Sequence, residues 1–274
     1  MQKPLVLLAL GLTLTSCASF PAAPKKLLVV ETTTGFRHDS IPTLEKILIQ
    51  LGKESGEFTV DCVQQPPGRG AEQAAAIKTA LEELSPQSLK NYDGVVFAST
   101  TGDLPIPDRQ AFLDWIKAGH AFIGIHAATD TFHGWPAYLD MLGGEFDHHG
   151  NQIDIECVNQ DPKNPATAQL GKSWKIKQEE VYQFKKYDPT KVHELLTLDI
   201  QPEVRNGTRA AGHYPVAWWK EYGKGTVFYT SLGHRDDIID ADPNLKNRVN
   251  SVETSQAYQA HLLGGIEFAL GLKK

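Results

Sequence analysis

The chain has 274 residues, of which 41% are hydrophobic and 22% charged, and this composition is typical of a folded domain with a sizeable core. Its formal net charge is −6, and its lysines and arginines are interspersed with acidic residues rather than gathered in a run. Because phosphate binding requires clustered basic side chains, the composition excludes nucleic acid as an expected partner.

Residues 1–17 are expected to be an export signal rather than part of the fold. Lys3 precedes the apolar segment PLVLLALGLTLT, which is short for a membrane span. The segment is followed by Ser16 and Cys17, and the resulting LTSC resembles the bacterial lipobox, which predicts lipidation of Cys17. Acyl chains on Cys17 would anchor an exported lipoprotein to a membrane, at an outer-membrane or periplasm-facing address, with residues 18–26 as a tether. An ordinary signal peptide with a chance cysteine is the alternative.

Residues 26–126 alternate between strand and helix patterns. Apolar or alternating runs predict strands over 26–32, 58–63, 92–100 and 120–126. Helical spacing predicts helices over 40–56, with Ser40 as its N-cap, over 71–84 and over 107–119. This alternation is typical of a mostly parallel sheet with helices on both faces, which is an α/β fold.

The pattern loosens between about residues 133 and 215, where polar, partly alternating segments predict antiparallel additions to the sheet. Residues 214–234 predict a hairpin with YGKG as its turn, and a final amphipathic helix is expected to be capped by Thr254. Cys62 and Cys157 lie in predicted strands and are expected to be free thiols. A single domain over residues 27–272 is the simplest organisation.

Three histidines follow predicted strands: His38 the first, His126 the fourth and His234 the last. Because ligands bind outside the carboxyl ends of parallel strands, we expect the three side chains to meet at one edge of the sheet. Arg37 and Asp130 lie beside them in the sequence. We therefore name His126, His234, Asp130 and Arg37 as candidate catalytic residues, with Asp130 orienting a histidine.

Imidazoles and a carboxylate suit a divalent transition metal such as Zn, Mn, Fe or Ni, with His38, His126 and His234 as the ligands. The same groups equally suit general acid–base catalysis near neutral pH, so both roles stay open. The sequence contains neither a GxGxxG nor a P-loop motif, and we expect no nucleotide cofactor.

Five segments together carry a family resemblance. The blocks GFRH, GIHAATDTF, LGGEFDHHG, EEVYQF and PVAWWKEYGKGTVFYTSLGH are similar, in this order, to the ThuA-like (trehalose utilisation) family, and the similarity extends from about residue 27 to residue 271. The resemblance implies a flavodoxin-like sheet of the class I glutamine amidotransferase type. It also implies a role in carbohydrate metabolism, particularly of oxidised 3-keto disaccharides, and metal binding in some relatives.

In class I glutamine amidotransferases a nucleophilic cysteine occupies a strand-to-helix elbow and a catalytic histidine follows a late strand. The resemblance places His126 at the elbow and His234 after the late strand, so glutaminase chemistry is not expected. Many relatives carry a His-Pro pair where this chain has Asn164 and Pro165, which puts any role of that histidine in doubt here.

Further side chains are candidates for sugar binding. Trp135, Tyr182 and Trp218 offer flat faces of the kind that stack on sugar rings, with core packing as the alternative. His148 and His149 are adjacent, so one should face the crevice and the other solvent, and His148 is the candidate.

The sequence thus predicts a surface-anchored enzyme that acts on a keto-sugar or its glycoside as an isomerase, a lyase or a hydrolase. Its partners would be a small carbohydrate and, through the lipid anchor, a membrane. The alternatives are a non-catalytic sugar-binding lipoprotein that uses the same crevice and a structural domain whose histidines have no function.

Overall fold

The computed structural model describes residues 23–201 and 210–274. The predicted export signal and lipidation site at Cys17 lie outside these residues. Within the described ranges, no helix combines the length and the apolar character needed to cross a bilayer.

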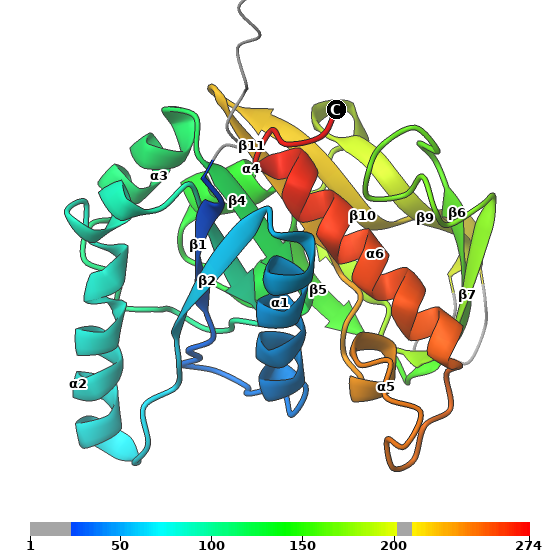
Figure 1. The fold of residues 1–274 in the computed structure, drawn as a ribbon, viewed down its shortest axis with the longest axis horizontal. Helices are drawn as coiled ribbons and strands as arrows, with labels where there is room; N and C mark the ends of the chain where they lie inside the picture. The colour runs from blue at the N-terminus through cyan, green and yellow to red at the C-terminus, as the bar shows by residue number, and fades with distance from the viewer. Residues whose placement is uncertain (1–22, 202–209) are drawn as a thin grey trace, which may run out of the picture.

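A nine-stranded sheet forms the centre of the molecule, in the order β2-β1-β3-β4-β11-β10-β9-β6-β7 (Figure 1). Its strands are β1 (Lys25–Val30), β2 (Phe58–Val63), β3 (Gly94–Ala98), β4 (Ala121–Ile125), β6 (Ile153–Asn159), β7 (Ser173–Glu179), β9 (His193–Gln201), β10 (Ala210–Tyr222) and β11 (Gly225–Thr230). A separate pair is formed by β5 (Glu145–His149) and β8 (Tyr182–Lys185).

The sheet has a parallel and an antiparallel half. Strands β2, β1, β3, β4 and β11 run parallel to one another, and β10, β9, β6 and β7 continue the sheet from β11 in antiparallel pairs. The 2-1-3-4-5 order of the parallel half is that of flavodoxin-like folds. The predicted α/β class, with antiparallel strands added to a mostly parallel sheet, is confirmed.

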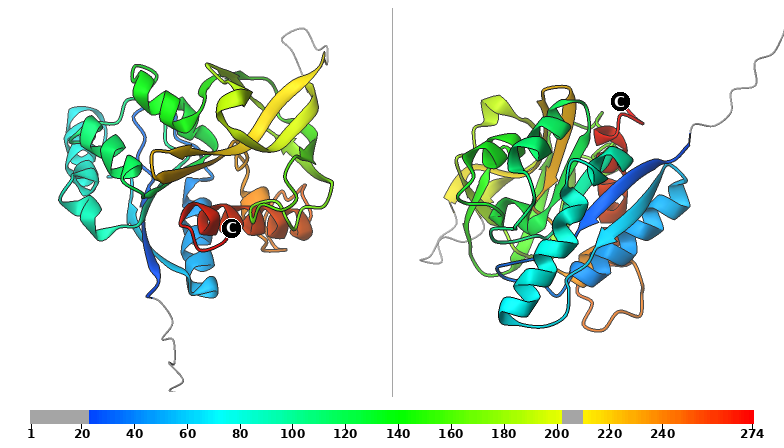
Figure 2. Two further views of the ribbon diagram at one scale, coloured as in Figure 1. Left: turned by 90° about the horizontal axis from the view of Figure 1, so that it is seen from above. Right: turned by 90° about the vertical axis from the view of Figure 1, so that its left-hand side faces the viewer.

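Helices cover both faces of the sheet. They are α1 (Ile41–Ser55), α2 (Gly70–Ala80), α3 (Arg109–Lys117), α4 (Pro136–Leu142), α5 (Asp236–Ile239) and α6 (Val252–Ala269), with short 3-10 turns η1 (Leu81–Leu84), η2 (Ser88–Asn91), η3 (His126–Asp130) and η4 (Pro189–Lys191). Both views in Figure 2 place α1 and α6 on one side of the sheet and α2 and α3 on the other.

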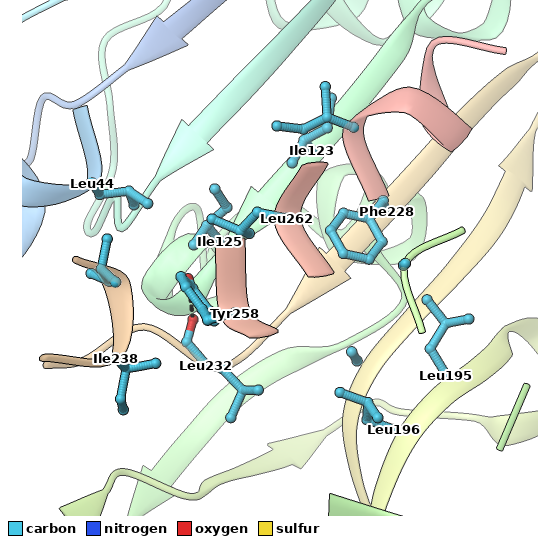
Figure 3. Packing of buried hydrophobic residues seen from close by; sticks show 14 of the residues in the cluster. Leu44, Ile123, Ile125, Leu195, Leu196, Phe228, Leu232, Ile238, Tyr258 and Leu262 are labelled. Atoms are coloured by element: carbon cyan, nitrogen blue, oxygen red, sulfur yellow. Dashed lines mark hydrogen bonds between the residues drawn. The ribbon is translucent and has the colours of Figure 1, made fainter. Parts of the chain in front are cut away.

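Each face of the sheet has its own core, because alternate residues of a strand point to opposite faces. Leu27 and Val29 of β1 join the core beneath α1, α5 and α6, whereas Leu28 and Val30 join the core beneath α2, α3 and α4. Figure 3 shows the first core, where the Tyr258 hydroxyl donates a hydrogen bond to the Leu232 carbonyl.

Ser40 is the N-cap of α1, as predicted, whereas the predicted cap of α6 at Thr254 is wrong. The side chain of Ser40 makes no capping hydrogen bond and instead donates to the Gly233 carbonyl at 3.1 Å, which joins the start of α1 to the loop after β11. The cap of α6 is Ser251, whose hydroxyl accepts from the backbone N–H of Thr254. The predicted hairpin is confirmed, with Tyr222 paired to Gly225 across its turn.

Candidate active site

The structure brings the three strand-end histidines together. His38 follows β1, His126 follows β4 and His234 follows β11. The ring centroids of His38 and His126 are 4.6 Å apart, those of His126 and His234 5.5 Å, and those of His38 and His234 5.6 Å. The convergence expected from parallel strands is therefore observed, whereas the roles of these residues stay predictions.

Glu180 completes the group, which we call the histidine cluster: His38, His126, Glu180 and His234. One ligand atom from each residue lies within 4.8 Å of the others. Oε2 of Glu180 is 3.2 Å from Nδ1 of His234 and 3.7 Å from Nε2 of His126. Sequence reasoning missed Glu180, which lies between β7 and β8, although it stands in the EEVYQF block that carries part of the family resemblance.

His126 is held in one orientation and one tautomer. Its Nδ1 lies 2.7 Å from the Ser231 carbonyl, and because a carbonyl only accepts, Nδ1 carries the proton. Its Nε2 therefore presents a lone pair toward the cluster, where the Tyr182 hydroxyl donates to it at 3.1 Å. A metal-binding histidine characteristically donates its other N–H to a carbonyl or carboxylate in this way.

Burial keeps two of the histidines neutral. Burial, together with the neighbouring His234, lowers the pKa of His38 to about 4, and burial likewise holds the pKa of fully buried His126 well below its usual value. Burial also disfavours charge on His234, but the contact with Glu180 raises its pKa above the usual value. Conversely, the same contact lowers the pKa of Glu180 against the effect of burial. Neutral imidazole and ionised carboxylate are the forms that bind metals.

Nδ1 of His38 is buried without a hydrogen-bond partner, and the buried Nδ1 of His234 and Oε2 of Glu180 have no partner other than each other. Such atoms are costly unless another group satisfies them. A divalent cation coordinated by the three imidazoles and the carboxylate would satisfy all of these atoms at once. The residues present therefore fit a transition metal of the predicted kind.

Glu179 supports the cluster through the backbone of His234. Its Oε1 accepts a hydrogen bond from the backbone N–H of His234 at 3.0 Å. Burial raises the pKa of Glu179 to about 8, so this carboxyl group is mostly protonated at neutral pH. The two adjacent glutamates thus carry different charges.

Two further candidates have partners outside the cluster. Arg37 donates from Nη1 to the backbone carbonyl of Glu31 at 2.6 Å. Asp130 contacts His133 rather than a histidine of the cluster, with Nε2 of His133 2.7 Å from Oδ1 of Asp130. The other ring nitrogen of His133 contacts Glu145 at 2.8 Å.

The candidate sugar-binding residues divide into two groups. Tyr182 lies in the site, with its ring centroid 4.6 Å from that of His126. Trp218 is fully buried and donates from its indole nitrogen to the Leu142 carbonyl, so its assignment as a stacking surface is corrected to a core residue. Trp135 is partly buried and packs on Phe132 in the core beneath α4.

The assignment of the adjacent histidines is also corrected. His148 is half-exposed, and its ring pairs with Asp147. His149 is the one that approaches the cluster, with Nε2 3.6 Å from Oε1 of Glu180 and its ring stacked on Tyr182. Both side chains belong to β5, which pairs with β8.

A cavity of about 280 Å³ adjoins His234. Its polar lining includes Asp39, Arg235, Lys246 and Asn247. Its volume lies near the lower end of the range for small-molecule pockets, about 300 Å³, which suits a group of monosaccharide size.

The family model described as "ThuA: Trehalose utilisation" matches residues 26–269. The chain belongs to the ThuA family. Its resemblance to that family, read from five sequence blocks, is thereby confirmed, and membership implies a carbohydrate-related function. A comparison with curated proteins finds no match.

Solved structures confirm the ThuA-type fold. A ThuA-like protein from Parabacteroides merdae is 22% identical, with a TM-score of 0.67 and coverage of 91% of each chain. A ThuA-like protein from Bacteroides uniformis is 18% identical, with a TM-score of 0.62, and the alignment covers 94% of this chain and 97% of the other. A cytoplasmic protein from Salmonella typhimurium is 15% identical, with a TM-score of 0.53, and the alignment covers 91% of this chain and 100% of the other.

Proposed function

We propose that this ThuA protein is an enzyme that acts on an oxidised sugar, a keto-sugar or its glycoside, at the histidine cluster with a divalent transition metal bound there. The observation that carries the proposal is the placement of three imidazoles and one carboxylate with their ligand atoms within 4.8 Å of one another. The family's link to trehalose utilisation supports a sugar as the substrate class.

The bound metal would supply Lewis acidity toward a sugar carbonyl. A carbonyl acidifies the adjacent C–H bonds, and an isomerase, lyase or hydrolase of keto-sugars begins by moving such a proton. In this chain, His149 and the Tyr182 hydroxyl lie beside the cluster and are placed to hold or move it. Burial raises the pKa of Tyr182 well above its usual value, so its hydroxyl is a donor at neutral pH.

The cavity beside His234 would receive the sugar. Arg235 lines it and is held in place by Asp237, with Nε 2.9 Å from Oδ1. Charged and amide groups such as Arg235, Asp39 and Asn247 match the dense hydroxyl groups of a sugar. Export and anchoring through Cys17 belong to the same proposal and are supported by the LTSC segment alone.

Elemental analysis of the purified protein, followed by a screen against 3-keto disaccharides, tests the proposal. We expect one transition metal at the histidine cluster and turnover of a keto-sugar. His126→Ala should lower the metal content by one ion per chain and abolish turnover, whereas His148→Ala, which changes a half-exposed side chain paired with Asp147, should leave both unchanged. Saturable sugar binding without turnover would replace the enzyme by a sugar-binding lipoprotein. A protein that binds no metal and no sugar would overturn the proposal.

A further inference from the structure

A second group of potential metal ligands lies outside the histidine cluster, where β1 ends beside α1 and β2. Glu31 follows β1, Glu45 lies on α1 and Cys62 lies on β2. One carboxylate oxygen from each glutamate and the sulfur of Cys62 all lie within 4.8 Å of one another. The five-strand parallel sheet brings these elements together, since Val29 of β1 pairs with Cys62.

Glu31 is buried with one carboxylate oxygen unpaired. It is 1% exposed, and its Oε1 has no hydrogen-bond donor. Burial is the main cause, and the charge of the nearby Glu45 the second, that raises the pKa of Glu31 to about 8; the charge of Arg37 acts to lower it. Arg37 directs its Nη1 to the backbone oxygen of Glu31. A buried carboxyl group that faces another carboxylate is satisfied by a proton or by a cation.

We propose that Glu31, Glu45 and Cys62 bind one thiophilic divalent cation of the Zn²⁺ type. A thiolate with two carboxylates and a water is a donor set that suits zinc, whereas Mg²⁺ and Ca²⁺ prefer oxygen ligands alone. Ligands around zinc lie about 2.0–2.3 Å from the metal, which places them roughly 3.3–3.8 Å from one another. Glu45 is half-buried on the helix surface, where its Oε1 accepts a hydrogen bond from Nε2 of Gln64 at 2.6 Å.

Binding of the cation would exchange protons for metal. The thiol of Cys62 and the carboxyl of Glu31 would release their protons to solvent, and the sulfur and oxygen lone pairs would then coordinate the cation. In the absence of a cation, burial and the two carboxylates raise the pKa of Cys62 to about 12, so its sulfur is a protonated thiol. The site would tie β1, α1 and β2 together at the start of the loop that carries His38.

Cobalt absorption separates this site from the histidine cluster, because only a thiolate ligand produces a near-ultraviolet sulfur-to-cobalt charge-transfer band. The full chain is stripped with a chelator and titrated with Co²⁺. We expect the band in the parent protein, in His126→Ala and in Cys157→Ser, whose parent thiol is buried in β6. We expect no band in Cys62→Ser. A parent protein without the band, or Cys62→Ser with it, would overturn the proposal.

Two glutamate variants test the oxygen ligands. Glu31→Gln should weaken Co²⁺ binding, measured from the charge-transfer band, by at least about tenfold, which is the lower limit for loss of a supporting group around a metal. Because Glu31 is buried, Glu31→Gln could fail to fold, and Glu45→Gln then provides the test. The same loss of Co²⁺ affinity is expected in Glu45→Gln. Glu54→Gln, an exposed change on the same helix, is the matched control and should bind as the parent does. Unchanged affinity in Glu45→Gln would show that Glu45 is not a ligand and would overturn the proposed site.

Discussion

The adjacent glutamates 179 and 180 allow a sharp test of the histidine cluster. Both are buried, both are next to His234, and each can be changed to glutamine without a change of shape. Glu180 is ionised and faces the ligand atoms, whereas Glu179 has a pKa raised by burial to about 8. Glu180→Gln therefore removes a negative charge from the site at neutral pH, and Glu179→Gln mostly replaces one neutral group by another.

The expected magnitudes differ accordingly. Glu180 places Oε2 3.2 Å from His234 and 3.7 Å from His126, in the middle of the ligand set. Loss of a supporting group around a metal costs about 10–100-fold in affinity, so loss of a ligating carboxylate should cost at least ~100-fold, or ~2.7 kcal/mol. The Gln oxygen in Glu179→Gln still accepts from the backbone of His234, and the loss there should stay below about tenfold.

The assay is a competition titration of chelator-stripped protein with Zn²⁺ against a chromophoric chelator. It is performed in a Cys62→Ser background, so that the second proposed site does not contribute. Circular dichroism confirms that each variant is folded. Equal losses in Glu179→Gln and Glu180→Gln would refute the charge assignment, and wild-type affinity in Glu180→Gln would refute the histidine cluster as a metal site.

Three other predictions concern separate parts of the chain. Cys17→Ser should release the protein from membranes or leave the precursor uncleaved, and fractionation that shows unchanged processing and membrane association would contradict lipidation. The double variant Cys62→Ser, Cys157→Ser should keep keto-sugar turnover, because neither thiol belongs to the histidine cluster; a folded double variant with no activity would show otherwise. Burial alone would raise the pKa of Glu145, but ion pairs, chiefly with Lys186, lower it to about 2, so its stabilisation is present above pH ~4.5 and is lost toward pH 2. In urea unfolding, the free energy of unfolding of Glu145→Gln should be about 2 kcal/mol below that of the parent protein at pH 7, a value already reduced for the exposure of the lysine partners. This difference should disappear at acid pH. A difference that is independent of pH would refute the ion-pair account.

Features with a local cause were predictable from the sequence. The strand over 58–63 coincides with β2, because its alternation reflects one buried and one exposed face. The convergence of His38, His126 and His234 followed from chain direction alone, since parallel strands deliver the residues after them to one edge. No side-chain detail was needed for either prediction.

Features that depend on distant partners were not predictable. Glu180 reaches the cluster from the junction of β7 and β8, whose placement rests on antiparallel register that the loosened pattern does not specify. The choice between His148 and His149 failed for a related reason: the register shifts between Phe146 and His148, so simple alternation does not indicate which ring faces inward. Trp218 illustrates a third limit, because a flat aromatic ring packs equally well in a core and on a sugar.

The backbone at His126 connects the fold to the proposed chemistry. His126 has a φ of 48° directly after β4, a left-handed conformation that costs an L-residue on the order of 1–3 kcal/mol unless its surroundings impose it. Here the Ser231 carbonyl holds one ring nitrogen and the Tyr182 hydroxyl contacts the other. In glutamine amidotransferases, which this fold resembles, the corresponding elbow exposes a nucleophilic sulfur. In this chain the same turn exposes a nitrogen lone pair to Glu180 and two more imidazoles. The strained turn at the end of β4 thus delivers the His126 ring to the histidine cluster, where the proposed metal would bind.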